Sequence, residues 1–135
     1  MSIEPWDKSM ELGHPIIDGQ HRRLYSLVIE LNTALENNSA PGLISRYLQD
    51  LLECALTHFE SEERIMDRAR YPGLEQHKAI HADFLDKGQK IAQAYAAGGV
   101  VLNETLAVFF AEWTLKHIQE EDRQAVEYIF NKKDS

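Results

Sequence analysis

The stretch LLECALTHFESEERIM, residues 51–66, decides the fold because an apolar helical stripe leads through it to two polar side chains. His58 and Glu62 stand four residues apart, and four residues bring an α-helix back to within about 40° of its starting face. The two side chains therefore project side by side from the stripe that faces the core. Such a pair suits a metal ion far better than an apolar interior, where an unpartnered charge is costly.

Apolar residues at helical spacing extend this pattern over most of the chain. Loop signals at 36–42, 71–73 and 98–99 divide it into four amphipathic helices, and a short fifth helix follows. Asp18 and Asn103 are the expected N-caps of the first and fourth helices. The expected segments are an N-terminal arm at 1–17 and helices at about 18–37, 42–68, 74–97, 103–118 and 123–131.

Short connections between the main helices favour one architecture, because they force neighbouring helices to run antiparallel. We therefore expect an all-α fold, an up-down-up-down antiparallel four-helix bundle with an N-terminal arm and a short C-terminal helix. The 135 residues are an ordinary size for the single domain that we expect. Trp6, Ile16 and Ile17 are the expected anchors of the arm.

His117 and Asp122 pose a geometric problem at the end of the fourth helix. They are five residues apart, which is about 140° off the same face of a regular helix. Both side chains face inward only if the helix ends or unwinds between them. We therefore expect an irregular turn around residues 118–121, before the short last helix.

Five histidines and two carboxylates fall on inner stripes at the same end of the expected bundle. They lie near the start of the first helix, late in the second, early in the third and at the end of the fourth. Because each helix reverses direction, these four zones share one layer. The candidate metal ligands are His21, His58, Glu62, His77, His81, His117 and Asp122.

The kind of metal follows from the donor atoms of this set. A single tetrahedral zinc ion uses only four ligands, and calcium and magnesium prefer oxygen. Two six-coordinate ions that share a solvent-derived oxygen and both carboxylates would have all positions but one filled. Iron and manganese remain as candidates, and iron is preferred for imidazole.

The remaining polar residues have simpler interpretations. Cys54, one turn before His58, is expected to be a small buried side chain, and a lone cysteine fits a reducing compartment. Glu11 and His14 match the ExxH motif of carboxylate-rich di-iron enzymes, but the flanking glycine and proline make a helix improbable there. Glu63 and the residues 120–121 are expected to face solvent.

The composition excludes several classes of function. A formal net charge of −8 opposes binding to nucleic acid and to anionic membranes. No apolar run approaches the roughly 18–20 residues that cross a bilayer. The N-terminus lacks a basic segment followed by an apolar one, so a secretion signal is not expected and the expected location is the cytoplasm.

Five short motifs are spread over nearly the whole chain. They are Trp6, Ile17-Asp18-Gly19-Gln20-His21, His58-Phe59-x-x-Glu62-Glu63, His77-x-x-x-His81 and Trp113-x-x-x-His117-Ile118-x-x-x-Asp122. The combination is highly specific, and it resembles the hemerythrin family, in particular its single-domain bacterial members.

The resemblance implies two iron ions with an oxo or hydroxo bridge, which bind O₂ reversibly at one open position without haem. It implies that His77, His81 and His117 are ligands of the coordinatively complete iron and that His21 and His58 are ligands of the other one. Glu62 and Asp122 would be the bridging carboxylates.

The resemblance also implies an O₂ pocket with Phe59, Trp113 and Thr114 among its residues. Thr114 stands where many relatives carry leucine, directly after the tryptophan of the last motif. Its hydroxyl group is expected to make the pocket wetter and to offer a bound ligand a hydrogen bond, so that either autoxidation is faster or small anions bind the ferric form more readily. The alternative is that Thr114 simply faces a neighbouring helix.

The expected function is oxygen storage, delivery or sensing by a protein that is not an enzyme, with O₂ or small anions as ligands. Three alternatives stay open. They are a di-iron enzyme with peroxidase or nitric-oxide-handling activity, an O₂ or redox signalling module with an unknown protein partner, and a metal-free bundle or iron store. The histidine-rich site with one open position, and the lack of a usable ExxH pair, favour ligand binding over oxygen activation.

Overall fold

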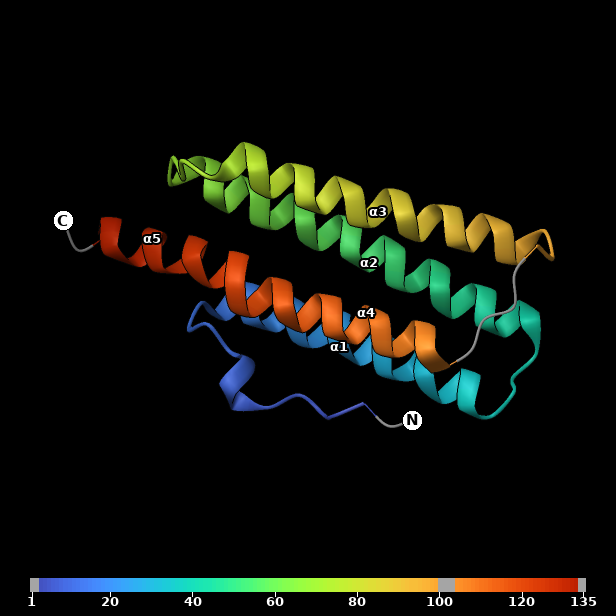
Figure 1. Cartoon of the computed structure of the whole chain (residues 1–135). Helices are drawn as coiled ribbons and strands as arrows, with labels where there is room; N and C mark the ends of the chain where they lie inside the picture. The colour runs from blue at the N-terminus through green and yellow to red at the C-terminus, as the bar shows by residue number, and fades with distance from the viewer. Residues whose placement is uncertain (1–2, 100–103, 134–135) are drawn as a thin grey trace.

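The computed structural model describes residues 3–99 and 104–133, which are helical except for short connections and the arm. The elements are a 3₁₀ helix at Lys8–Met10, α1 at Pro15–Glu36, α2 at Pro41–Arg68, α3 at Leu74–Ala96, α4 at Glu104–His117, a π-helical turn at Ile118–Asp122 and α5 at Arg123–Lys133. Helices α1 to α4 lie side by side and alternate in direction (Figure 1). The expected up-down-up-down four-helix bundle is confirmed, and α5 continues the line of α4.

The first helix begins earlier than expected. It starts at Pro15, and His14 is its N-cap, with the His14 Nδ1 atom 3.4 Å from the backbone N–H of Ile17 that donates to it. Proline suits the first position of a helix because its φ angle is preset and its missing N–H has no partner there anyway. The expectation that Asp18 is the N-cap was therefore wrong.

Asp18 instead fastens the arm to the first turn of α1. Its buried carboxylate accepts hydrogen bonds from the backbone N–H of Leu12 at 2.8 Å and of Gly13 at 3.0 Å. Gly13 has a φ of 89°, a left-handed conformation that a residue with a side chain seldom adopts. The carboxylate thus holds a sharp turn that brings the arm back along the bundle.

The arm is anchored by Trp6, as expected. The Trp6 ring meets the Tyr25 ring edge to face, with centroids 5.8 Å apart, and the Tyr25 hydroxyl donates to the carbonyl of Glu4. Ile17 is completely buried, whereas Ile16 is 59 % exposed, so Ile16 is not an anchor. The difference arises because both residues belong to α1, where consecutive side chains point about 100° apart.

Three further positions concern a helix cap, the inner stripe of α2 and the packing of α2 on α3. The expected N-cap Asn103 lies outside the described residues. Cys54 is half-buried, while the neighbouring Ala55 is completely buried, so Ala55 is the member of the inner stripe. Gly88 allows α3 to approach α2 closely, because a Cβ atom there would lie 2.4 Å from Leu52 Cδ2.

The apolar core lies between α1, α2, α3 and α4 and ends against a polar layer. Its largest completely buried members include Tyr25, Leu48, Phe59 and Phe110. None of the described helices combines the length and the apolar character that a bilayer-spanning segment needs.

The irregular turn expected after His117 is confirmed as the π-helical turn Ile118–Asp122. A π turn holds more residues than an α turn, so it changes the angle between residues on either side of it. Both His117 and Asp122 are buried. The turn therefore allows two residues at a spacing of five to face the interior together.

Candidate metal centre

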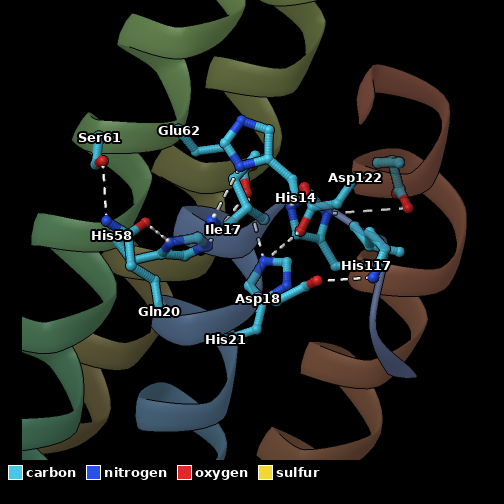
Figure 2. A network of polar contacts seen from close by, with 12 residues as sticks. His14, Ile17, Asp18, Gln20, His21, His58, Ser61, Glu62, His117 and Asp122 are labelled. Atoms are coloured by element: carbon cyan, nitrogen blue, oxygen red, sulfur yellow. Dashed lines mark hydrogen bonds and ion pairs between the residues drawn. The ribbon is translucent and has the colours of Figure 1, made fainter. Parts of the chain in front are cut away.

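The seven candidate ligands lie together at the end of the bundle that carries the α2–α3 connection. Each of them is at most 4 % exposed. They come from α1, α2, α3, α4 and the π turn. Figure 2 shows the members from α1, α2, α4 and the π turn approaching one another. A layer that contains five imidazoles and two carboxylates is exceptional in a bundle interior, because buried ionisable groups need close partners.

The donor atoms form two groups that overlap. In each group, the donor atoms all lie within 4.8 Å of one another. The first group contains His77, His81 and His117, and the second contains His21 and His58. Glu62 and Asp122 belong to both groups. The layer is therefore divided into a three-histidine half and a two-histidine half that share the carboxylates.

Glu62 turns one oxygen to each half. Its Oε1 atom lies 2.8 Å from His77 Nε2 and 3.4 Å from His81 Nε2. Its Oε2 atom lies 3.2 Å from His58 Nε2 and 3.4 Å from His21 Nε2. The carboxylate thus spans the two groups of imidazoles.

Asp122 also directs one carboxylate oxygen to each half. Its Oδ1 atom lies 2.8 Å from His77 Nε2 and 3.1 Å from His117 Nε2, whereas its Oδ2 atom lies 3.0 Å from His21 Nε2. Two carboxylates that each direct one oxygen to either side have the arrangement of bridging ligands for a pair of ions.

Three donor atoms at the middle of the layer are left unsatisfied by the described residues. His21 Nε2, Glu62 Oε2 and Asp122 Oδ2 are buried, and their close approaches do not have hydrogen-bond geometry. An unpaired buried polar atom is costly, and nearly all such atoms in folded proteins have partners. Cations between these atoms would satisfy all three at once.

The rings of His81 and His117 direct their Nε2 atoms toward each other in the three-histidine half. Their Nε2 atoms are 2.9 Å apart. The Nδ1 atom of His81 lies 2.8 Å from Glu63 Oε2, and a carboxylate only accepts, so the proton of the neutral ring belongs on Nδ1. The Nε2 lone pair then faces the centre, as a metal ligand requires.

Comparison with known proteins identifies the family. A family model described as the hemerythrin HHE cation binding domain matches residues 12–129. The chain belongs to the hemerythrin family.

Members of this family from distant organisms are similar along most of their length. The bacteriohemerythrin of Stenotrophomonas maltophilia (strain R551-3) is 24 % identical over 129 residues, which is 96 % of this chain and 83 % of that protein. Myohemerythrin-1 of Phascolopsis gouldii is 30 % identical over 119 residues, 87 % of either chain. The crystal structure of a wild-type hemerythrin shares the fold, with a TM-score of 0.88 at 22 % identity over 95 % of this chain and 98 % of that one.

The family is known for oxygen binding at a di-iron site, and hemerythrins are oxygen-binding proteins rather than enzymes. The donor set of this chain fits such a site. Imidazole and carboxylate together suit iron, and the two overlapping groups offer places for a pair of ions with shared carboxylates. The seven residues thus form a group able to hold metal.

The electrostatics of the hemerythrin layer show what holds it together without metal. Burial lowers the pKa of His21, but the adjacent carboxylates of Asp122 and Glu62 outweigh burial and raise this pKa to about 9. The same balance raises the pKa of His77 to about 9. Burial raises the pKa of Glu62, yet its contacts with His21 and the other imidazoles hold the pKa well below its usual range.

Asp122 follows the same balance. Burial and the nearby charge of Glu62 raise the pKa of Asp122, but His117 and His21 outweigh them and lower it to about 2. In the metal-free protein the layer therefore holds two ionised carboxylates, Glu62 and Asp122, beside the protonated rings of His21 and His77. Metal ions would take the place of those protons.

Aromatic rings cover the layer on its core side. Phe59 stacks on the His81 ring at a centroid distance of 3.8 Å, and Trp113 stacks on the His117 ring at 4.9 Å. Thr114 is buried, and its hydroxyl donates to the carbonyl of Phe110 at 2.8 Å. The expected hydrogen bond from Thr114 to a ligand therefore competes with a bond inside α4, because a threonine in a helix readily reaches the carbonyl one turn back.

Three polar residues that touch the histidines were missed as site residues. The Gln20 Oε1 atom lies 2.7 Å from His58 Nδ1, and Glu63 contacts His81 as described above. Glu121 Oε2 lies 3.9 Å from His117 Nδ1. Each of the three is adjacent in sequence to a candidate ligand, and this adjacency was the available signal.

Proposed function

We propose that the chain binds O₂ reversibly at two iron ions held by the seven buried residues, and that it stores, delivers or senses oxygen. The main support for the proposal is the orientation of Glu62 and Asp122. Each of these carboxylates directs one oxygen toward the three-histidine half and the other toward the two-histidine half. When bound, two iron ions with an oxo or hydroxo bridge would supply the electrons that reversible O₂ binding requires.

The two halves of the layer would have different roles, because they contain different numbers of histidines. His77, His81 and His117 would hold one ion, and His21 and His58 would hold the other. Both ions would share Glu62 and Asp122, so the two-histidine half has one protein donor fewer. We assign the open position for O₂ or a small anion to that half.

The protein around the ions would keep the site dry. Phe59 lies between the halves, with its ring centroid 3.8 Å from that of His81 and 5.7 Å from that of His58, and Trp113 stacks on His117. The completely buried Met66 lies one turn beyond Glu62 in α2. An apolar shell limits solvent access, which protects a bound ligand from loss by proton transfer. We include Phe59, Trp113 and Thr114 in this O₂ pocket.

The proposal includes the place where the protein works. Cys54 is a free, half-buried thiol, and burial raises its pKa, which makes it a poor nucleophile. A free cysteine suits a reducing compartment. We therefore propose the cytoplasm, with O₂ or a small anion as the ligand and without a nucleic-acid partner.

Anaerobic loading with ferrous iron, followed by an optical spectrum before and after exposure to air, tests the proposal. We expect two irons per chain and a ligand-to-metal charge-transfer band that vanishes when O₂ is removed and returns when it is restored. His77→Ala should abolish the band. His14→Asn is the matched control, because it removes a histidine outside the layer and leaves a residue that caps helices well. A wild-type band that never reverses would contradict reversible binding.

A further inference from the structure

The ring nitrogens that face away from the centre have chemically different partners in the two halves. In the two-histidine half, His58 Nδ1 lies 2.7 Å from the amide oxygen of Gln20. In the three-histidine half, His81 Nδ1 lies 2.8 Å from a carboxylate oxygen of Glu63. One histidine of each half thus donates outward, in one case to a neutral acceptor and in the other to an acid.

The amide of Gln20 is held in a fixed orientation. Its Nε2 atom donates to Ser61 Oγ at 3.0 Å, and its oxygen is then the atom that faces His58. Figure 2 shows Ser61, Gln20 and His58 joined in one chain of hydrogen bonds between α1 and α2. The amide oxygen would therefore hold the His58 proton on Nδ1 and leave the Nε2 lone pair free to bind a metal ion in the layer.

The three-histidine half carries a second acid beside Glu63. Glu121, in the π turn, has a buried Oε2 atom 3.9 Å from the Nδ1 atom of His117. This separation is too long for a hydrogen bond but is within the range of an ion pair. Two acids thus stand behind the rings of one half, and an uncharged amide stands behind a ring of the other.

The physical consequence concerns the strength of the ligands. A ring N–H that donates to a carboxylate loses part of its proton density, which makes the other ring nitrogen a stronger electron donor to a metal. The negative charge of Glu63 also attracts the ion directly, because solvent screens this partly buried carboxylate less than it screens a fully exposed one. An amide oxygen orients a ring equally well. Because it carries no net charge, it strengthens the other ring nitrogen less and attracts the ion less than a carboxylate does.

We propose that Glu63, acting through His81, makes the three-histidine position the tighter of the two, and that the neutral Gln20 leaves the two-histidine position weaker. This inference rests on the proposed two-metal function. Glu63 and Gln20 are positioning residues, and Glu121 adds to the effect of Glu63 through His117. The protein would fill the three-histidine position first and keep the other ion the more exchangeable of the pair.

Titration of the metal-free protein with Zn²⁺ against a chromophoric chelator tests the proposal, because zinc binding is independent of O₂ chemistry. We expect two binding steps in the wild type. Glu63→Gln should weaken the first step about 10- to 100-fold, the usual effect of losing such a partner, and leave the second within about threefold. Gln20→Glu should strengthen the second step and narrow the gap between the two.

Glu60→Gln is the matched control, because Glu60 is exposed on the same helix and its loss removes the same charge. It should leave both steps unchanged. Glu63→Asp should recover part of the first-step affinity, because it restores the charge with a shorter reach. ¹⁵N spectra of the histidines should show the proton of His81 on Nδ1 in the wild type and a weaker hydrogen bond in Glu63→Gln.

The outcomes separate this inference from the proposed function. Two zinc ions per chain with step affinities that are the same in the wild type and in Glu63→Gln would overturn the inference and leave the two-metal centre intact. Fewer than two ions in the wild type would overturn both. Circular dichroism checks that each variant folds, and if Glu63→Gln does not fold, unchanged affinities in Gln20→Glu would overturn the inference.

Discussion

Asp122 stands five residues after His117, and its Oδ1 atom nevertheless lies 3.1 Å from His117 Nε2. The π-helical turn Ile118–Asp122 makes this contact possible, since it brings two residues at a spacing of five to one face. π turns inside longer helices are frequent at functional sites. Here the turn supplies a carboxylate that both halves of the layer share.

A deletion in the π turn should leave the metal content unchanged, whereas an insertion should reduce it. Deleting the exposed Glu120 leaves His117 and Asp122 four residues apart, a spacing that an ordinary α-helix brings to one face. We expect that variant to keep two metal ions per chain. An alanine inserted after Glu120 should rotate Asp122 away and reduce the metal content, as measured by elemental analysis. Equal metal content in both variants would contradict this account of the turn.

Loss of a shared carboxylate should weaken both steps of metal binding, whereas loss of a histidine should weaken only one. Glu62→Gln should weaken both steps of metal binding, because Glu62 faces both halves. His21→Ala should weaken one step about 10-fold or more and leave the other nearly unchanged, because His21 belongs to the two-histidine half alone. Stepwise zinc titration measures both. Identical patterns in the two variants would argue against the division of the layer.

Two substitutions of Thr114 distinguish the effect of side-chain volume in the pocket from the effect of the hydroxyl group. Because its hydroxyl hydrogen is bonded to the carbonyl of Phe110, Thr114→Val should change the decay of the oxy form by less than about threefold. Thr114→Leu should slow that decay, because the larger apolar side chain excludes water. The decay is timed optically at constant temperature and pH. A large effect of the valine variant would show that the hydroxyl itself acts on the ligand.

Metal uptake by the metal-free protein should release protons. A histidine must be neutral to bind a metal, and the pKa values of His21 and His77 are about 9, so both rings are mostly protonated at pH 7.5. Zinc binding at that pH should release about two protons, and the apparent affinity should rise with pH up to about 9. Calorimetry in buffers of different ionisation enthalpy counts the protons. A count near zero would contradict the raised pKa values.

The same shifts set the pH dependence of the metal-free fold. The pKa of His21 and of His77 is raised from 6.5 to about 9 on folding, so protonation stabilises the folded state. This stabilisation is complete below about pH 6.5 and is lost as the pH rises through about 9. The melting temperature of the metal-free protein should therefore fall over this range, and that of the metal-loaded protein should not. A flat profile for the metal-free protein would contradict the sign of the shift.

Gly88 tests the close approach of α2 and α3. A Cβ atom at this position would lie 2.4 Å from the buried Leu52 Cδ2, and overpacking of a core costs about 1–3 kcal/mol, which outweighs the gain of about 1 kcal/mol from replacing a helical glycine. Gly88→Ala should lower the free energy of unfolding, as measured with urea. The control is Gly42→Ala, because no atom lies within 4 Å of that Cβ position. A Gly88→Ala variant as stable as Gly42→Ala would show that the helices separate freely.

The sequence predicts the layer well because the facing of a residue within one helix follows from spacing alone. His58 with Glu62, and His77 with His81, illustrate this, since each pair is four residues apart. The irregular turn was also predictable, because the spacing of His117 and Asp122 excludes a regular helix between two inward residues. Short connections then decided the antiparallel order of the helices.

The remaining details depend on how one helix meets another. Glu63 and Glu121 were expected to face solvent, because they lie beside the inner stripe, and only the relative rotation of neighbouring helices brings them to His81 and His117. The start of α1 was missed because aspartate is by type a much better N-cap than histidine, which favoured Asp18 over His14. The preset φ angle of Pro15 and the hydrogen bonds from the arm to Asp18 decided between them.

A crystal structure of the protein loaded anaerobically with ferrous iron, with anomalous data collected on both sides of the iron edge, tests the central claim most directly. We predict two iron peaks within the layer, with Glu62 and Asp122 each giving one oxygen to either ion, three histidines on one ion and two on the other. A single iron peak, or a carboxylate with both oxygens on the same ion, would contradict the account.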